Sequence, residues 1–131
     1  MPRRFSSEEA DALLPEIAPR LLQLRDLKRQ NDETRSAVND LQSTLKANGH
    51  SLDIEMSRLS RALQSSSAEI NALIERVTRL GVEVKDLEMG LIDFRGERDG
   101  REIYLCWKLG EEHVAFWHEL NTGYSSRQPL D

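Results

Sequence analysis

The apolar positions between Leu52 and Leu80 recur in alternating steps of four and three residues. The positions of this repeat are Leu52, Met56, Leu59, Leu63, Ser66, Ile70, Leu73, Val77 and Leu80. Such spacing is typical of a helix that packs along its whole length against another helix. Only Ser66 is polar, so the pattern predicts a helical seam that is interrupted by one polar layer.

The segment before this repeat also has helical periodicity. Ser6 precedes Glu9 by three residues, which is the spacing of a capping box at a helix start. Pro15 and Pro19 each lack a backbone donor, so we expect a short helix over 7–14 and then a long one whose first turn holds a proline. The apolar side of the long helix is formed by Ile17, Leu21, Leu24, Leu27, Val38, Leu41 and Leu45.

A short break separates the two long helices and predicts an antiparallel hairpin. The Asn48-Gly49 step supplies the break, because glycine accepts the left-handed backbone of a helix C-terminal cap. A turn directly after it places Ser66 opposite Glu33, within one turn of Asn31. Both helices then become polar in the same layer, which favours this alignment.

The sequence pattern changes at Gly81. After this residue, apolar and polar residues alternate and glycines become frequent, whereas the preceding segment has a helical period. We expect three strands joined by turns at 96–100 and 108–112. The strands cover Gly90–Arg95, Arg101–Trp107 and His113–Glu119. The predicted fold class is α+β, with a long antiparallel, coiled-coil-like helical hairpin over 6–80. A C-terminal three-stranded antiparallel β-meander with a tail covers 81–131, and residues 1–131 form a single domain.

Strand parity predicts two different sheet faces. With Leu105 opposite Ala115, the face expected to pack on the hairpin carries Ile92, Phe94, Ile103, Leu105, Trp107, Ala115 and Trp117. The second face carries Leu91, Asp93, Glu102, Tyr104, Cys106, Val114, Phe116 and His118. The hairpin can cover only one face. We therefore expect a two-fold homodimer that uses the second face or the off-seam apolar residues Leu13, Leu22, Ile54 and Ile74. The alternative is a tail over 121–131 that folds back onto the second face.

Composition narrows the possible partners. The chain has 131 residues, 38% of them hydrophobic and 31% charged, with a net charge of −5. A negative charge argues against nucleic acid as a partner. No apolar run approaches the length of a membrane span, and no signal-peptide core is present, so we expect a cytoplasmic protein. Cys106 stands alone and is expected to be a small buried residue in a reducing compartment.

Two kinds of chemistry are conceivable on the second sheet face. Asp93, Glu102 and His118 share one end of it and could bind a divalent transition metal; the alternative is a plain histidine–carboxylate hydrogen bond. Cys106 with His118 as base and Asp93 as orienter would suit a hydrolase, but a thiol in mid-strand is more often packed than reactive. We expect Arg127 to clamp the tail to Asp93 or Glu119.

Motifs at both ends of the chain resemble a known family. They are Phe5-Ser6, Glu9-Ala10, Leu14-Pro15, Val84-Lys85-Asp86-Leu87, Gly90-Leu91-Ile92-Asp93-Phe94, Tyr104-Leu105-Cys106-Trp107-Lys108-Leu109-Gly110-Glu111, Phe116-Trp117-His118-Glu119, Gly123 and Arg127-Gln128-Pro129-Leu130. As a set they look like small prokaryotic proteins catalogued as a domain of unknown function (number twenty-two zero three). The resemblance implies no activity. It does imply that the family pattern includes Asp93, Cys106, Trp107, Gly110, Glu111, Trp117, His118 and Arg127.

The sequence therefore favours a non-enzymatic, self-associating interaction or scaffold protein of the cytosol. The alternative is a small metal-binding protein that uses the histidine and carboxylates of the sheet. An enzyme is less favoured, because the chain has no glycine-rich phosphate loop and no nucleophile elbow.

Overall fold

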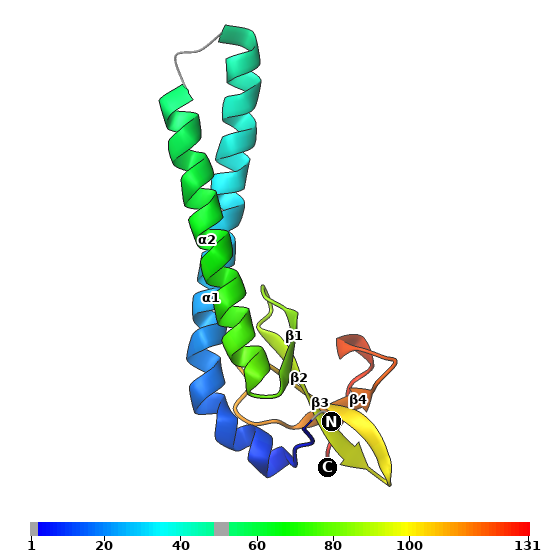
Figure 1. Cartoon of the computed structure of the whole chain (residues 1–131). Coiled ribbons are helices and arrows are strands. Elements are labelled where there is room, and N and C mark those ends of the chain that lie inside the picture. Colours follow the sequence, from blue (N-terminus) through cyan, green and yellow to red (C-terminus); the bar gives the residue numbers. More distant parts are fainter. Residues whose placement is uncertain (1–2, 49–52) are drawn as a thin grey trace.

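A computed structural model describes residues 3–48 and 53–131 and shows two long helices followed by an antiparallel sheet. The elements are α1 (Ser7–Asn48), α2 (Asp53–Arg79), β1 (Val82–Asp86), β2 (Leu91–Arg98), β3 (Arg101–Lys108), β4 (Phe116–Glu119), a short 3₁₀ helix (Tyr124–Ser126) and β5 (Gln128–Pro129). The helical hairpin rises from the sheet, which lies at its base together with the start of α1 and the C-terminus (Figure 1). The expected α+β class is confirmed. The turn expected after Asn48 lies outside the described residues.

Helix α1 is a single helix, so the expected break near residue 14 is wrong. Pro15 and Pro19 both lie inside it, four residues apart on one exposed face. The two proline rings are therefore exposed to solvent. The opposite face of the helix still packs on the sheet, with Leu14 and Ile17 buried. The first turns bend away from the rest of the helix (Figure 1), which is the usual response to an internal proline.

The predicted capping box is present at the start of α1. The Glu9 amide donates to Ser6 Oγ at 3.1 Å, and the Ser6 amide donates to Glu9 Oε1 at 3.0 Å. Two of the amides that a helix start leaves unpaired are thus satisfied by side chains. The preceding Phe5 packs edge-on against Phe94 with ring centroids 5.3 Å apart, which anchors the helix start to the sheet.

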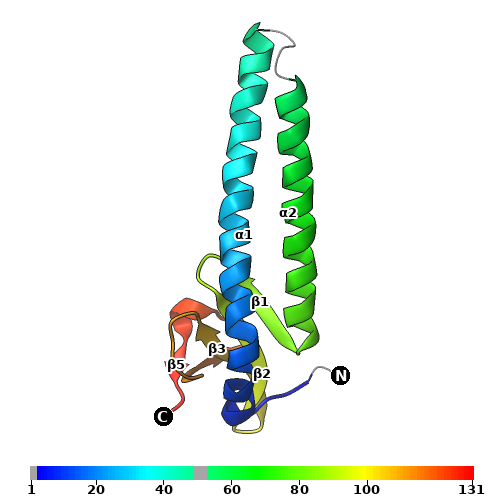
Figure 2. The ribbon, with the colours of Figure 1, turned by 90° about the vertical axis from the view of Figure 1, so that its left-hand side faces the viewer.

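The two helices run side by side (Figure 2) and share the polar layer that the repeat predicts. Asn31 Nδ2 donates to Ser66 Oγ at 2.8 Å and to Ser67 Oγ at 3.0 Å, and Asn31 is only 7% exposed. This contact confirms the predicted alignment of the hairpin. Neither helix, over its described residues, is long and apolar enough to cross a membrane.

The sheet has five strands in the order β1-β2-β3-β4-β5 rather than the expected three. Sequence reasoning missed β1, which directly follows the Gly81 cap of α2, and the two-residue strand β5. The turn between β2 and β3 is also shorter than expected: Asp99 and Gly100, both with positive φ, form a two-residue hairpin loop. Gly96 belongs to β2, where an added Cβ would lie 3.1 Å from the Phe5 carbonyl oxygen.

The parity of the sheet faces is confirmed, although the register of the last pair differs. Leu105 pairs with Trp117 instead of Ala115, a shift of two residues that leaves every strand residue on its predicted face. β4 starts only at Phe116, because the Val114 amide donates to Asp11 Oδ1 at 2.6 Å instead of joining a strand ladder. Val114 consequently packs in the core and Ala115 is exposed, so the faces predicted for these two residues before the strand are wrong.

The C-terminal tail folds back beside β4 and covers part of the second sheet face. β5 pairs with β4, and the Leu130 amide donates to the Ala115 carbonyl oxygen at 2.9 Å. The Arg127 guanidinium lies 4.0 Å from the centre of the Phe116 ring and 4.4 Å from that of Tyr124. The alternative of a folded-back tail is therefore the arrangement that the structure contains.

Candidate functional site

Three chemically distinctive side chains meet on the second sheet face, one from each of three neighbouring strands. Asp93 of β2 pairs directly with Cys106 of β3, while His118 of β4 pairs with Tyr104, two residues before Cys106. One ligand atom from each of the three residues lies within 4.8 Å of the others, and all three residues are buried. The strand ladders set the backbone positions of all three residues.

Glu102, the third member of the predicted metal set, lies outside this cluster. Its carboxylate accepts from Arg95 Nη1 and Arg4 Nε, the latter at 3.2 Å. Glu102 is therefore part of a charged network at the sheet surface. The structure brings Asp93 and His118 together, as expected, and places Cys106 rather than Glu102 beside them.

His118 uses both ring nitrogens. Nδ1 lies 2.8 Å from the backbone carbonyl oxygen of Glu119, and Nε2 lies 3.0 Å and 3.1 Å from the two carboxylate oxygens of Asp93. The Tyr104 ring lies against the imidazole with centroids 5.3 Å apart. The side chains of His118 and Asp93 are 2% and 3% exposed, so this contact is shielded from water.

The electrostatics of the cluster do not favour nucleophilic catalysis by Cys106. Burial, together with the nearby Asp93 carboxylate, raises the pKa of the Cys106 thiol to about 12. Burial also raises the pKa of Asp93, although the neighbouring His118 opposes this shift. A cysteine nucleophile must be a thiolate near neutral pH, and catalytic cysteines have lowered pKa values. The cysteine-hydrolase alternative therefore lacks its activated nucleophile.

Arg127 borders the cluster but does not bind the acids that we expected. Its guanidinium makes two hydrogen bonds to Glu111, at 2.6 Å and 3.0 Å, and Nη1 lies 3.9 Å from Cys106 Sγ. Glu119 instead pairs with Arg101, and Asp93 pairs with His118. Sequence reasoning did not pair Arg127 with Glu111, although the family resemblance places both residues in its pattern.

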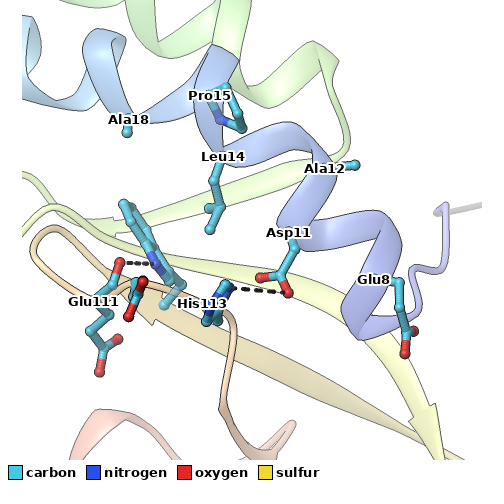
Figure 3. Close-up of a pocket in the computed structure, with 10 residues that line it drawn as sticks. Glu8, Asp11, Ala12, Leu14, Pro15, Ala18, Glu111 and His113 are labelled. Carbon is cyan, nitrogen blue, oxygen red and sulfur yellow. Dashed lines mark hydrogen bonds and ion pairs between the residues drawn. The ribbon is translucent and has the colours of Figure 1, made fainter.

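A shallow groove of about 580 Å³ opens on the other side of the sheet, between α1 and the loop after β3. Acidic residues line it from both sides, Glu8 and Asp11 on α1 and Glu111 on the loop, and Figure 3 shows Asp11 facing His113. His113 Nδ1 lies 3.8 Å from Asp11 Oδ2. Asp93, Cys106 and His118 do not line this groove.

Comparisons with known proteins agree with the resemblance drawn from the motifs. The model of a family described as an uncharacterized conserved protein (DUF2203) matches residues 3–130. No curated protein and no solved structure gave a significant match. The family model spans both helices and the whole sheet, including the Asp93–Cys106–His118 cluster. The chain therefore belongs to the DUF2203 family.

Proposed function

We propose that the protein is a non-enzymatic interaction or scaffold protein of the cytosol that self-associates through the outer part of its helical hairpin. This outer part, the arm, consists of residues 32–48 of α1 and 53–69 of α2. The single observation that carries the proposal is the burial pattern of the arm. None of its described side chains is buried, whereas the base of the hairpin contains Leu14, Ile17, Leu21, Leu24, Leu73 and Val77 in the core.

An arm without buried side chains has little of the packing that stabilises helices in proteins. Its seam residues Met56, Leu59 and Leu63 are all only partly covered by α1, and Ile54 is 86% exposed. Packing against a second arm would bury these side chains on both sides, as in a four-helix bundle. A second copy of the chain supplies a matching apolar surface through a two-fold contact.

Two further observations support this choice of surface and class. The second sheet face, the other surface considered for self-association, already carries the C-terminal tail. The sheet cluster holds a cysteine with a strongly raised pKa rather than an activated nucleophile. The lone free Cys106 also suits a reducing compartment such as the cytosol.

Light scattering of the full chain at micromolar concentrations tests the proposal. The expected mass is twice the 15.0 kDa of one chain. Ile54→Glu should shift the protein to monomer without lowering its thermal stability at high dilution, because this side chain is 86% exposed and has little packing to lose within one chain. Burying the new carboxylate in a dimer contact would be costly.

Leu120→Glu is the matched control, since Leu120 is an exposed leucine (41%) beyond β4 and far along the chain from the arm. It should leave the dimer intact. A strictly monomeric wild-type protein would contradict self-association, and dissociation by Leu120→Glu but not by Ile54→Glu would move the contact to the sheet end.

A further inference from the structure

In its neutral form, His118 directs a ring-nitrogen lone pair at a carboxylate. The backbone carbonyl of Glu119 can only accept a hydrogen bond, so the ring nitrogen Nδ1, 2.8 Å away, carries a hydrogen. In a neutral imidazole the other nitrogen, Nε2, is then an acceptor. It faces both carboxylate oxygens of Asp93 at 3.0–3.1 Å, and these are acceptors too. A proton on Nε2 joins the two groups in a hydrogen bond, and a metal ion in place of that proton would bind both of them.

The arrangement around His118 matches that of a metal ligand. Histidines that bind metals commonly donate their second ring N–H to a backbone carbonyl, which fixes the ring and directs the free nitrogen at the metal. The Glu119 carbonyl provides this contact for His118. A third donor, Cys106 Sγ, belongs to the same buried group, within 4.8 Å of the nitrogen and the carboxylate oxygen.

The distances suit a four-coordinate ion of the size of zinc. Bond lengths of about 2.0 Å to nitrogen and oxygen and about 2.3 Å to sulfur place the donors of a tetrahedral site about 3.3–3.5 Å apart. The observed donors are spaced from 3.0 Å to at most 4.8 Å, so small side-chain rotations would reach this geometry. Sulfur, imidazole and carboxylate together form a ligand set of intermediate softness, which zinc accepts.

Charge balance is also favourable. A thiolate and a carboxylate would neutralise a divalent ion, and the neighbouring Arg127 is already paired with Glu111 in a contact with 12% and 17% exposed side chains. Among the described residues, no other histidine, cysteine or acidic side chain belongs to the group as a fourth ligand. The fourth position would therefore be left to a solvent molecule or a small exogenous ligand.

We propose that Asp93, Cys106 and His118 form a binding site for one divalent transition-metal ion, with Zn²⁺ as the best-matched ion. The site connects β2, β3 and β4 across the second sheet face, beside Arg127 of the C-terminal tail. It is independent of the arm, so it goes beyond the proposed self-association. In this site Cys106 would be a metal ligand and not only a small buried residue of the sheet.

Titration of chelator-treated, untagged full-length protein with Co²⁺ tests the site. The expected result is a thiolate-to-cobalt absorption band and strong visible bands of tetrahedral cobalt, saturating at one equivalent and abolished by added Zn²⁺. Because the band requires a sulfur ligand and Cys106 is the only cysteine, the wild-type spectrum alone identifies the ligand. Zn²⁺ should also raise the melting temperature of the wild-type protein.

Cys106→Ala and His118→Ala should each abolish the cobalt spectrum and the thermal shift, with circular dichroism used to verify folding. His113→Ala is the matched control, because the His113 side chain is 69% exposed and lies on the opposite side of the sheet; it should bind cobalt as the wild type does. A wild-type protein that gives no thiolate band, or a band that survives Cys106→Ala, would overturn the proposal.

Discussion

At the residue scale, the Arg127–Glu111 pair joins the tail to the sheet. Arg127 makes two hydrogen bonds to Glu111, and one Glu111 oxygen also accepts from the Lys108 amide at 2.9 Å. The guanidinium covers the Phe116 ring and lies beside Cys106. The Arg127 side chain therefore connects the tail to the loop after β3 and lies against the buried cluster.

Arg127→Ala should lower the free energy of unfolding by about 2–3 kcal/mol, because it leaves the mostly buried Glu111 carboxylate without its charged partner. Denaturant unfolding measures this loss. Arg127→Lys should recover only part of it, since an ammonium group cannot make the paired contact of a guanidinium. In a double-mutant cycle with Glu111→Gln the two losses should not add. Fully additive losses would show that the two side chains do not act together.

At the element scale, the hairpin combines a well-packed base and a sparsely packed arm along the same helices. Leu24 is fully buried where α1 packs near the sheet, whereas Leu63 in the arm is only partly buried. The Asn31–Ser66 layer lies between the buried base and the partly exposed arm. A regular repeat in the sequence therefore does not imply uniform burial in one chain.

Leu24→Ala should cost about 2–5 kcal/mol of unfolding free energy, as for other fully buried leucines. Leu63→Ala should cost clearly less in the monomer, because part of its surface already contacts water. Thermal unfolding of both variants at a concentration that favours the monomer measures the difference. Equal losses would indicate that the arm is as tightly packed as the base and would remove the main reason for self-association.

The elements differ in how far their sequence predicts them. The alignment of Asn31 with Ser66 follows from counting helical turns from one break. The continuity of α1 could not be predicted, since it depends on Pro15 and Pro19 facing solvent while the other face packs on the sheet. β1 is a short alternation directly after a helix, and β5 contains Pro129, so neither has a strong local signal.

Turn length explains why Cys106 rather than Glu102 lies beside Asp93. A turn over 96–100 would have brought Asp93 towards the Glu102 end of β3. The two-residue turn at Asp99-Gly100 instead places Asp93 opposite Cys106. Turn length sets the register of a hairpin, and the register decides which side chains become neighbours. Strand parity alone could identify the face but not the third member of the cluster.

At the scale of the whole molecule, the sheet and the base of the hairpin share one core, and the arm extends beyond it (Figure 1). α1 alone has 42 residues, a length of about 63 Å at 1.5 Å per residue. The buried cluster lies at one end of this rod and the arm at the other. The two proposals therefore concern separate parts of the protein and can fail separately.

The most direct test of the central claim is a distance measurement between arms. Ser65→Cys introduces a labelling site on an exposed position of α2, and the buried Cys106 should remain unlabelled. Pulsed electron spin resonance on the nitroxide-labelled protein should give a defined distance between labels on two chains, and Ile54→Glu should abolish it. A dipolar signal that contains only the background of separated monomers would contradict the proposed association through the arm.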